Sequence, residues 1–207
     1  MKLLNWKMVL LVVLSIAGLA FLGLRVWNNQ PSDHFFNPMD KTPVFSFKDQ
    51  TGEVFASDEL KGKVWVSDFI FTRCAGQCPM LSQWMRVLQK DWSGNSDFKL
   101  VSFSVDPNYD TVSVFRQYAN DLQADDQQWH FLTGPKDKIY ETIQKGFRLT
   151  AEKDPQGTPG YQFIHTTRLI LVDANGMIRG MYDGQDAVEV EKLKKDIHYL
   201  MNSRTKS

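Results

Sequence analysis

The stretch KVWVSDFIF at residues 63–71 runs directly into TRCAGQCP at residues 72–79. Its first part is rich in β-branched and aromatic residues, which predicts a buried central strand. Pro79 then stands at the first-turn position that proline favours, and the apolar side chains between Leu81 and Trp92 fall on one helical face. The chain is therefore expected to pass from a central strand into a helix, with two cysteines at the turn between them.

Outward from this unit, strands and helices alternate along the chain. Strands are expected at 44–47, 53–55, 99–105, 129–132, 168–172 and 177–182, helices at 112–121, 135–145 and 188–201, and a long loop at 150–163. Early βαβ units that end in a β-hairpin and a helix imply a mixed central sheet flanked by helices on both faces. This order of elements suits the α/β thioredoxin-like fold.

The composition is that of an ordinary globular protein. The 207 residues include 24 Lys and Arg against 24 Asp and Glu, so the formal net charge is zero. Because no stripe of basic residues offers an electrostatic footprint for phosphates, we expect no nucleic-acid partner. The length allows one domain and a short appendage.

The appendage is predicted to be a membrane anchor at residues 1–27. Met8–Leu24 is a run of 17 residues without a charge, and Lys2 and Lys7 precede it. As a helix this run comes close to the thickness of a bilayer core, and the positive-inside rule then exports the C-terminal part. A cleaved signal peptide is the alternative, with Gly18-Leu19-Ala20 as its cleavage site.

With either reading the folded part lies outside the cytoplasm, and with an anchor it is held at the periplasmic side of the inner membrane. Residues 28–42 are polar, contain two prolines and are expected to form a tether. The folded domain is then expected at residues 43–203.

Cys74 and Cys78 are the two cysteines of the chain and the strongest functional signal. They follow a strand end, where open α/β sheets place their ligands. Cys78 lies at or near a helix N-terminus, where the dipole favours a thiolate. Two convergent sulfurs can hold a soft metal or oxidise to a disulfide, and the spacing alone does not choose between these. A purely structural disulfide is a further alternative, although it would close only a small loop.

Of the four histidines, His165 is the candidate third ligand. It lies immediately before the strand expected at 168–172, and in a thioredoxin-like sheet the loop that enters this strand lies beside the cysteine turn. His34 falls in the tether, whereas His130 and His198 are expected to be packing or surface residues.

Two thiolates and one imidazole form a trigonal set that suits Cu(I) and, with an added weak ligand, Cu(II). Structural zinc normally has four protein ligands, and the chain has no second cysteine pair, so copper is favoured over zinc. Met85 lies on the apolar helical stripe and is expected to fill the core, and Met80 is a weaker candidate for a thioether ligand.

These motifs resemble the Sco/SenC family of copper-binding proteins. The resemblance is carried by residues 62–79, by Ser104-Val105-Asp106-Pro107 with Asp110-Thr111, and by His165-Thr166-Thr167 before residues 169–173. It implies a thioredoxin-like fold and copper bound by Cys74, Cys78 and His165. It also implies a role in maturing the dinuclear copper centre of cytochrome c oxidase, with the copper-receiving oxidase subunit and a thiol reductant protein as partners.

Three positions depart from the family pattern. Ala75 stands where proline is common, Tyr109 where arginine is common, and Ile164 where an acidic or hydroxyl residue is common. The last change removes a candidate accessory ligand or outer hydrogen-bond partner of the metal.

Two functions from different classes follow from these residues. A membrane-tethered metallochaperone, which is not an enzyme, would capture copper and pass it to a client. A thiol–disulfide oxidoreductase would act on the cysteines of exported proteins. The usual thioredoxin-like catalysts have two residues between their cysteines and a proline before the later strand, and this chain has neither feature. The chaperone interpretation is therefore preferred.

Overall fold

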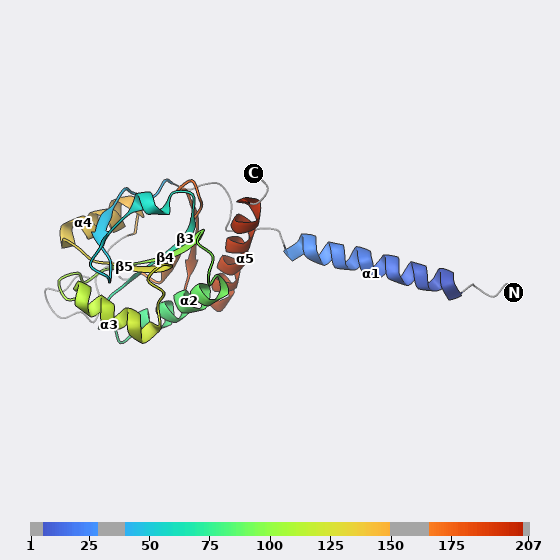
Figure 1. The fold of residues 1–207 in the computed structure, drawn as a ribbon, viewed down its shortest axis with the longest axis horizontal. Helices are drawn as coiled ribbons and strands as arrows, with labels where there is room; N and C mark the ends of the chain where they lie inside the picture. The colour runs from blue at the N-terminus through green and yellow to red at the C-terminus, as the bar shows by residue number, and fades with distance from the viewer. Residues whose placement is uncertain (1–5, 29–39, 150–165, 205–207) are drawn as a thin grey trace.

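The computed structural model describes residues 6–28, 40–149 and 166–204 (Figure 1). The strands are β1 (Ser46–Lys48), β2 (Val54–Ala56), β3 (Val64–Ile70), β4 (Phe98–Ser104), β5 (Trp129–Leu132), β6 (Arg168–Val172) and β7 (Ile178–Asp183). The helices are α1 (Trp6–Asn28), α2 (Cys78–Asp91), α3 (Val112–Leu122), α4 (Lys136–Glu141) and α5 (Ala187–Arg204). The expected alternation of strands and helices is thus confirmed.

Five strands form one mixed sheet in the order β5-β4-β3-β6-β7. β3 lies at its centre and pairs in parallel with β4, which pairs in parallel with β5, whereas β6 runs antiparallel to both β3 and β7. All seven residues of β3 are buried, because helices or loops cover both faces of the sheet. The stretch that decides the fold is therefore its central strand, as predicted.

Alternation along β3 divides the hydrophobic core into two layers. Val64, Val66 and Ile70 face a layer closed by α2, α3 and α5. Trp65 and Phe69 face the other layer, which is closed by the β1–β2 hairpin, by α4 and by the segment after α4. Figure 1 shows α2 and α4 on opposite sides of the sheet.

One expected helix is composite. The segment predicted as a helix at 135–145 begins as α4 and continues as a π-helical turn over Thr142–Gly146. Gly146 packs against Pro43 so closely that an added Cβ would lie 2.3 Å from the proline ring. A short 3₁₀ turn at Ser57–Leu60 also links β2 to β3, which the sequence pattern did not predict.

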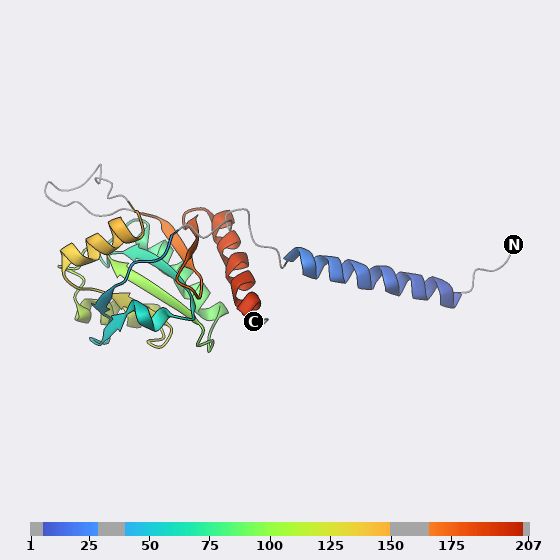
Figure 2. The ribbon, with the colours of Figure 1, turned by 90° about the horizontal axis from the view of Figure 1, so that it is seen from above.

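The N-terminal segment forms the helix α1, which stands apart from the α/β body in both views (Figures 1 and 2). Its side chains from Met8 to Phe21 are exposed. Within the described residues, no helix has both the length and the apolar character that crossing a membrane requires. Most of the expected tether, residues 29–39, lies outside the described residues.

Candidate metal centre

The two cysteines are held by the turn between β3 and α2. The backbone N–H of Cys74 donates to the carbonyl of Phe71 at 3.2 Å, which curls the chain as it leaves the strand. The carbonyl of Gln77 accepts the N–H groups of Met80 and Leu81, both at 3.1 Å, and so closes the first turn of α2. Cys78 therefore stands at the helix N-terminus, as expected, and neither cysteine is in a disulfide.

The two sulfurs share one proton unequally. The thiol of Cys78 donates to the sulfur of Cys74, and this hydrogen bond lowers the pKa of Cys74 to about 5. Backbone N–H groups of Cys78, Gly76 and Gln77 also point at the Cys74 sulfur and favour its negative charge. The pKa of Cys78 is raised, because its proton is held in that hydrogen bond and because the thiol is buried. At neutral pH the site thus carries one thiolate, on Cys74, and one thiol.

Two carboxylates of the β4–α3 loop fasten the cysteine turn. The backbone N–H and the hydroxyl of Thr72 donate to Oδ1 of Asp110 at 3.1 and 2.6 Å, and the hydroxyl of Ser104 donates to Oδ2 at 2.7 Å. The guanidinium of Arg73 donates from Nε and Nη2 to Oδ2 of Asp106 at 3.0 and 2.6 Å. The loop between Thr72 and Cys78 is therefore positioned by hydrogen bonds from outside the turn.

The same guanidinium also lies over the ring of Tyr109, with Cζ 4.4 Å from the ring centroid. Tyr109 is one of the positions that depart from the family pattern, and here the ring takes up a cation–π contact beside the cysteine turn.

The two sulfurs differ in access. Cys78 is only 4% exposed and packs into the core layer with α2, whereas Cys74 is partly exposed. Met85 is fully buried, which confirms that it fills the core. Met80 is 36% exposed on the first turn of α2. An incoming ion or protein would therefore meet Cys74 before it meets Cys78.

His165, the predicted third ligand, lies outside the described residues, so the proposed set of three ligands remains a prediction. The described chain resumes just after it, and this part lies beside α2. The carbonyl of Thr167 accepts the N–H of Gly184 at 2.8 Å, and the carbonyl of Gly184 accepts the indole N–H of Trp84 at 3.0 Å. The amide of Gln185 lies 3.3 Å from that of Gln77, which stands between the two cysteines.

Two of the remaining histidines are accounted for by packing. His130 is buried against Phe55, with ring centroids 4.0 Å apart, and its Nδ1 lies 3.1 Å from a carboxylate oxygen of Asp49. Its burial lowers its pKa. His198 packs on the ring of Trp92 at 4.8 Å. His34 lies outside the described residues.

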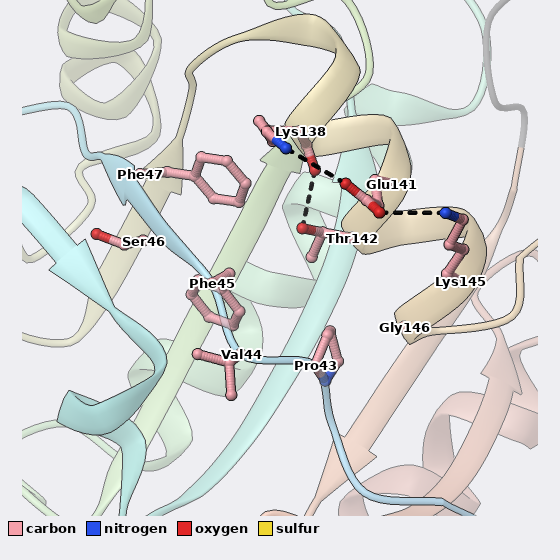
Figure 3. A pocket seen from close by; sticks show the side chains of 10 residues that line it. All are labelled: Pro43, Val44, Phe45, Ser46, Phe47, Lys138, Glu141, Thr142, Lys145 and Gly146. Carbon is pink, nitrogen blue, oxygen red and sulfur yellow. Dashed lines mark hydrogen bonds and ion pairs between the residues drawn. The ribbon is translucent and has the colours of Figure 1, made fainter.

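No group of three or more His, Cys, Asp or Glu within the described part of the chain is arranged to hold a metal ion. A groove on the opposite face of the sheet, between the segment before β1 and α4, is also a poor candidate (Figure 3). Its charged side chains pair with one another, since Glu141 lies 3.1 Å from Lys145 and 3.6 Å from Lys138. The cysteine turn remains the candidate site.

Sequence reasoning missed a polar cluster beneath the cysteines. Asp68 is fully buried on β3, and the hydroxyls of Ser82 and Tyr118 lie 2.8 Å apart between α2 and α3. Burial raises the pKa of Asp68 to about 7 and that of Tyr118 to about 12. The signal that could have revealed it is the charged residue at an inward position of KVWVSDFIF.

Comparisons with known proteins agree with this architecture. The chain is 33% identical over 184 residues to the SCO1 protein homolog of Bacillus subtilis, covering 87% of this chain and 92% of that protein. The structure of BsSco, described with a disulfide switch as a member of the Sco family of cytochrome c oxidase assembly proteins, matches with a TM-score of 0.68 at 31% identity. That match covers 83% of this chain and 98% of BsSco.

The structure of ScoI from Bradyrhizobium japonicum with copper bound matches with a TM-score of 0.60 at 25% identity, over 78% of this chain and all of that one. These likenesses confirm the expected α/β fold with its central sheet flanked by helices. A family model described as SCO1/SenC covers residues 37–202. On this model and on the identity to the B. subtilis protein, the chain belongs to the SCO1/SenC family.

Proposed function

We propose that this protein captures copper through Cys74, Cys78 and His165 outside the cytoplasm and passes it to the copper-receiving subunit of cytochrome c oxidase. The observation that carries the proposal is the pair of free cysteines, Cys74 and Cys78, on the turn that begins α2. A thiolate already stabilised by a thiol and by backbone N–H groups is a ready ligand for a soft cation. ScoI, a relative at 25% identity, binds copper, and BsSco belongs to a family of oxidase assembly proteins.

Chain connectivity supports His165 as the third ligand. Thr167 is two residues beyond it and is joined through Gly184 to Trp84 on α2. Two residues of chain span up to about 7 Å, which allows His165 to reach the region of the first turn of α2. Copper is the cargo of such a site, so a low number of ligands with one exposed sulfur suits its release to a client.

The exposed apolar helix α1 is proposed to tether the domain to the membrane. Tethering would place the site at a high effective concentration near a membrane-embedded oxidase. A thiol reductant protein would keep the two cysteines reduced, because a disulfide cannot bind the metal. Extraction of membranes with alkaline carbonate tests the tether. If α1 anchors the protein, the full-length chain should remain in the membrane pellet.

A titration of the reduced full-length chain with Cu(I) in mild detergent tests the copper site. We expect one copper per chain, with affinity lost in Cys74→Ser and Cys78→Ser and lowered in His165→Ala. His198→Ala is the matched control, because this histidine packs on Trp92 and not at the cysteine turn. Unchanged affinity and spectrum in His165→Ala would remove this residue from the site.

A second function, thiol–disulfide exchange, is favoured by one observation. The low pKa of Cys74 beside a buried thiol is the arrangement of an attacking and a resolving cysteine. Rapid turnover of a disulfide substrate by the copper-free chain would rank this function above copper transfer.

A further inference from the structure

An apolar hollow on the outer side of α2 begins directly beside the cysteine turn and has no role in the site as described so far. Four of the five side chains that line it are apolar, and the five are Pro79, Met80, Gln83, Trp84 and Val87. Met80 and Val87 are each 36% exposed, and they lie two helical turns apart on one face of α2. Exposed apolar side chains that gather in one place, beside a reactive group, indicate a surface that contacts another molecule.

The hollow is held rigid by its surroundings. Figure 1 shows α2 between α3 and α5. The indole N–H of Trp84 donates to the carbonyl of Gly184 at 3.0 Å, which fixes the ring against the loop that leads into α5. Pro79 restricts the backbone in the first turn of α2. Because these groups are already ordered, a partner that covers them pays little conformational entropy.

A basic edge borders the hollow on the side of α3. A second hollow there shares Val87 with the first and is also lined by Arg86 and Lys90. The guanidinium of Arg86 donates to the amide oxygen of Gln123 at 2.6 Å, which leaves its charge uncompensated. Neither cation forms an ion pair within the described part of the chain, and Asp125 is the one carboxylate that lines the same hollow. The edge is therefore net positive.

The position of this surface identifies the partner that covers it. The partly exposed sulfur of Cys74 is followed by the small, exposed residues Ala75 and Gly76 and then by Pro79. A protein that takes a cation from Cys74 therefore touches this end of α2. Residues 69–90 contain three basic side chains and no acidic one, so an approaching surface that carries carboxylates is attracted to it.

A second copy of this chain fits the surface less well. A two-fold contact centred on the outer side of α2 would bring Arg86 and Lys90 of both copies into one interface. Like charges placed together in an interface repel each other. A partner that has carboxylates at the border of its apolar contact avoids this repulsion.

We propose that the copper-receiving protein docks on the outer side of α2. Its apolar side chains fill the hollow around Met80 and Val87, and its Asp or Glu side chains face Arg86 and Lys90. Because a helix rises 1.5 Å per residue, this surface extends about 18 Å along α2 from Cys78 to Lys90. The inference rests on the proposed transfer of copper, and it assigns the surface that recognises the client.

The test measures docking without copper. Isothermal titration calorimetry follows the binding of the soluble copper-receiving domain of the oxidase subunit, taken from the same organism, to the reduced full-length chain in mild detergent. Both proteins are free of copper, so that no heat of copper transfer enters the signal. Val87→Glu places a carboxylate in the hollow at an exposed helix position. Val54→Glu is the matched control, because Val54 is 64% exposed on β2, in the hairpin that covers the other face of the sheet.

We expect Val87→Glu to raise the Kd for docking at least about tenfold, and Val54→Glu to change it less than about twofold. The double variant Arg86→Gln/Lys90→Gln should weaken docking about tenfold at low salt and reduce the dependence of the Kd on salt, since exposed charges are screened. A Kd for Val87→Glu within about threefold of the wild type overturns the proposal. Wild-type docking that is insensitive to salt, or no measurable docking of the wild type, overturns it as well.

Failure of the copper function is scored separately. All three variants should bind Cu(I) with the affinity of the wild type, because no substitution alters a proposed ligand, and this result also shows that they are folded. If the wild type binds no copper, the proposed function fails, while the docking titration still tests the surface. If Val87→Glu binds copper and passes it to the domain at the wild-type rate, the surface assignment fails and the copper function stands.

Discussion

The stability of the protein should depend on pH through Asp68. Burial raises its pKa from 3.8 to about 7, so the folded chain holds a proton on Asp68 over a range in which the unfolded chain has lost it. The stabilisation that the raised pKa of Asp68 gives to the folded state is therefore complete below about pH 4, and it is lost as the pH rises towards 7. Asp68→Asn cannot ionise and should remove the dependence.

The size of the effect follows from the shift in pKa. About three pKa units at 1.36 kcal/mol each give a cost of about 4 kcal/mol for the ionised, fully buried carboxylate above pH 7. We therefore expect Asp68→Asn to gain about 4 kcal/mol of unfolding free energy relative to the wild type between pH 4 and pH 8. The whole stability of a domain this size is on the order of 10 kcal/mol, so the change is easily measured.

Urea unfolding, followed by tryptophan fluorescence at pH 4, 6 and 8 in reductant, gives the difference between variant and wild type at each pH. Other titrating groups are common to both proteins and cancel in that difference. Ser67→Ala should show an offset that does not change with pH. A difference between Asp68→Asn and wild type that stays constant across the range would refute the ionisation of a buried Asp68.

Three further perturbations test the site. The rate at which iodoacetamide alkylates Cys74, followed by mass spectrometry, should rise with pH with a midpoint near pH 5. Cys78→Ala removes the hydrogen-bond donor and should move that midpoint towards the ordinary thiol pKa of about 8.5. Asp110→Ala leaves the donors of Thr72 and Ser104 unpaired and should lower the unfolding free energy, measured by urea titration, by about 3 kcal/mol. A loss below about 1 kcal/mol would mean that the carboxylate does not hold the turn. In Gly184→Ala the new methyl would lie 2.3 Å from the side chain of Leu81, so the variant should cost about 2 kcal/mol and weaken copper binding without moving the Cys74 midpoint.

Local patterns predicted most of the fold because its main elements are encoded locally. The β-branched and aromatic run of β3 and the apolar stripe after Pro79 each report burial over a few consecutive residues. The cysteine turn was equally accessible, because Cys74 and Cys78 lie on one short loop between those two elements. The composite helix at α4 was not, because the packing of Gly146 on Pro43 joins residues that are far apart in the chain.

The contacts that tune the site were hidden for the same reason. Asp110 accepts from Thr72 across 38 residues, and nothing in the spacing of Asp106 and Asp110 indicates that they hold the cysteine turn. Asp68 reads in the sequence as one polar residue in a strand, and its electrostatic influence on Cys78 and Tyr118 depends on how the helices pack against that strand. Periodicity reports which face is buried, but it does not report which polar groups meet there.

In the proposed function, the charge distribution of the two closely spaced thiols would suit transfer of a cation better than permanent binding. Two thiolates in contact would repel each other, so the resting pair carries one negative charge on the more exposed sulfur. In the proposed function a captured cation would meet Cys74 first, and Cys78 would become a ligand only when its proton leaves. Return of that proton would weaken the hold on the cation again. Because Cys78 is buried and its pKa is raised, capture and release of the cation would be coupled to the loss and return of one proton on Cys78.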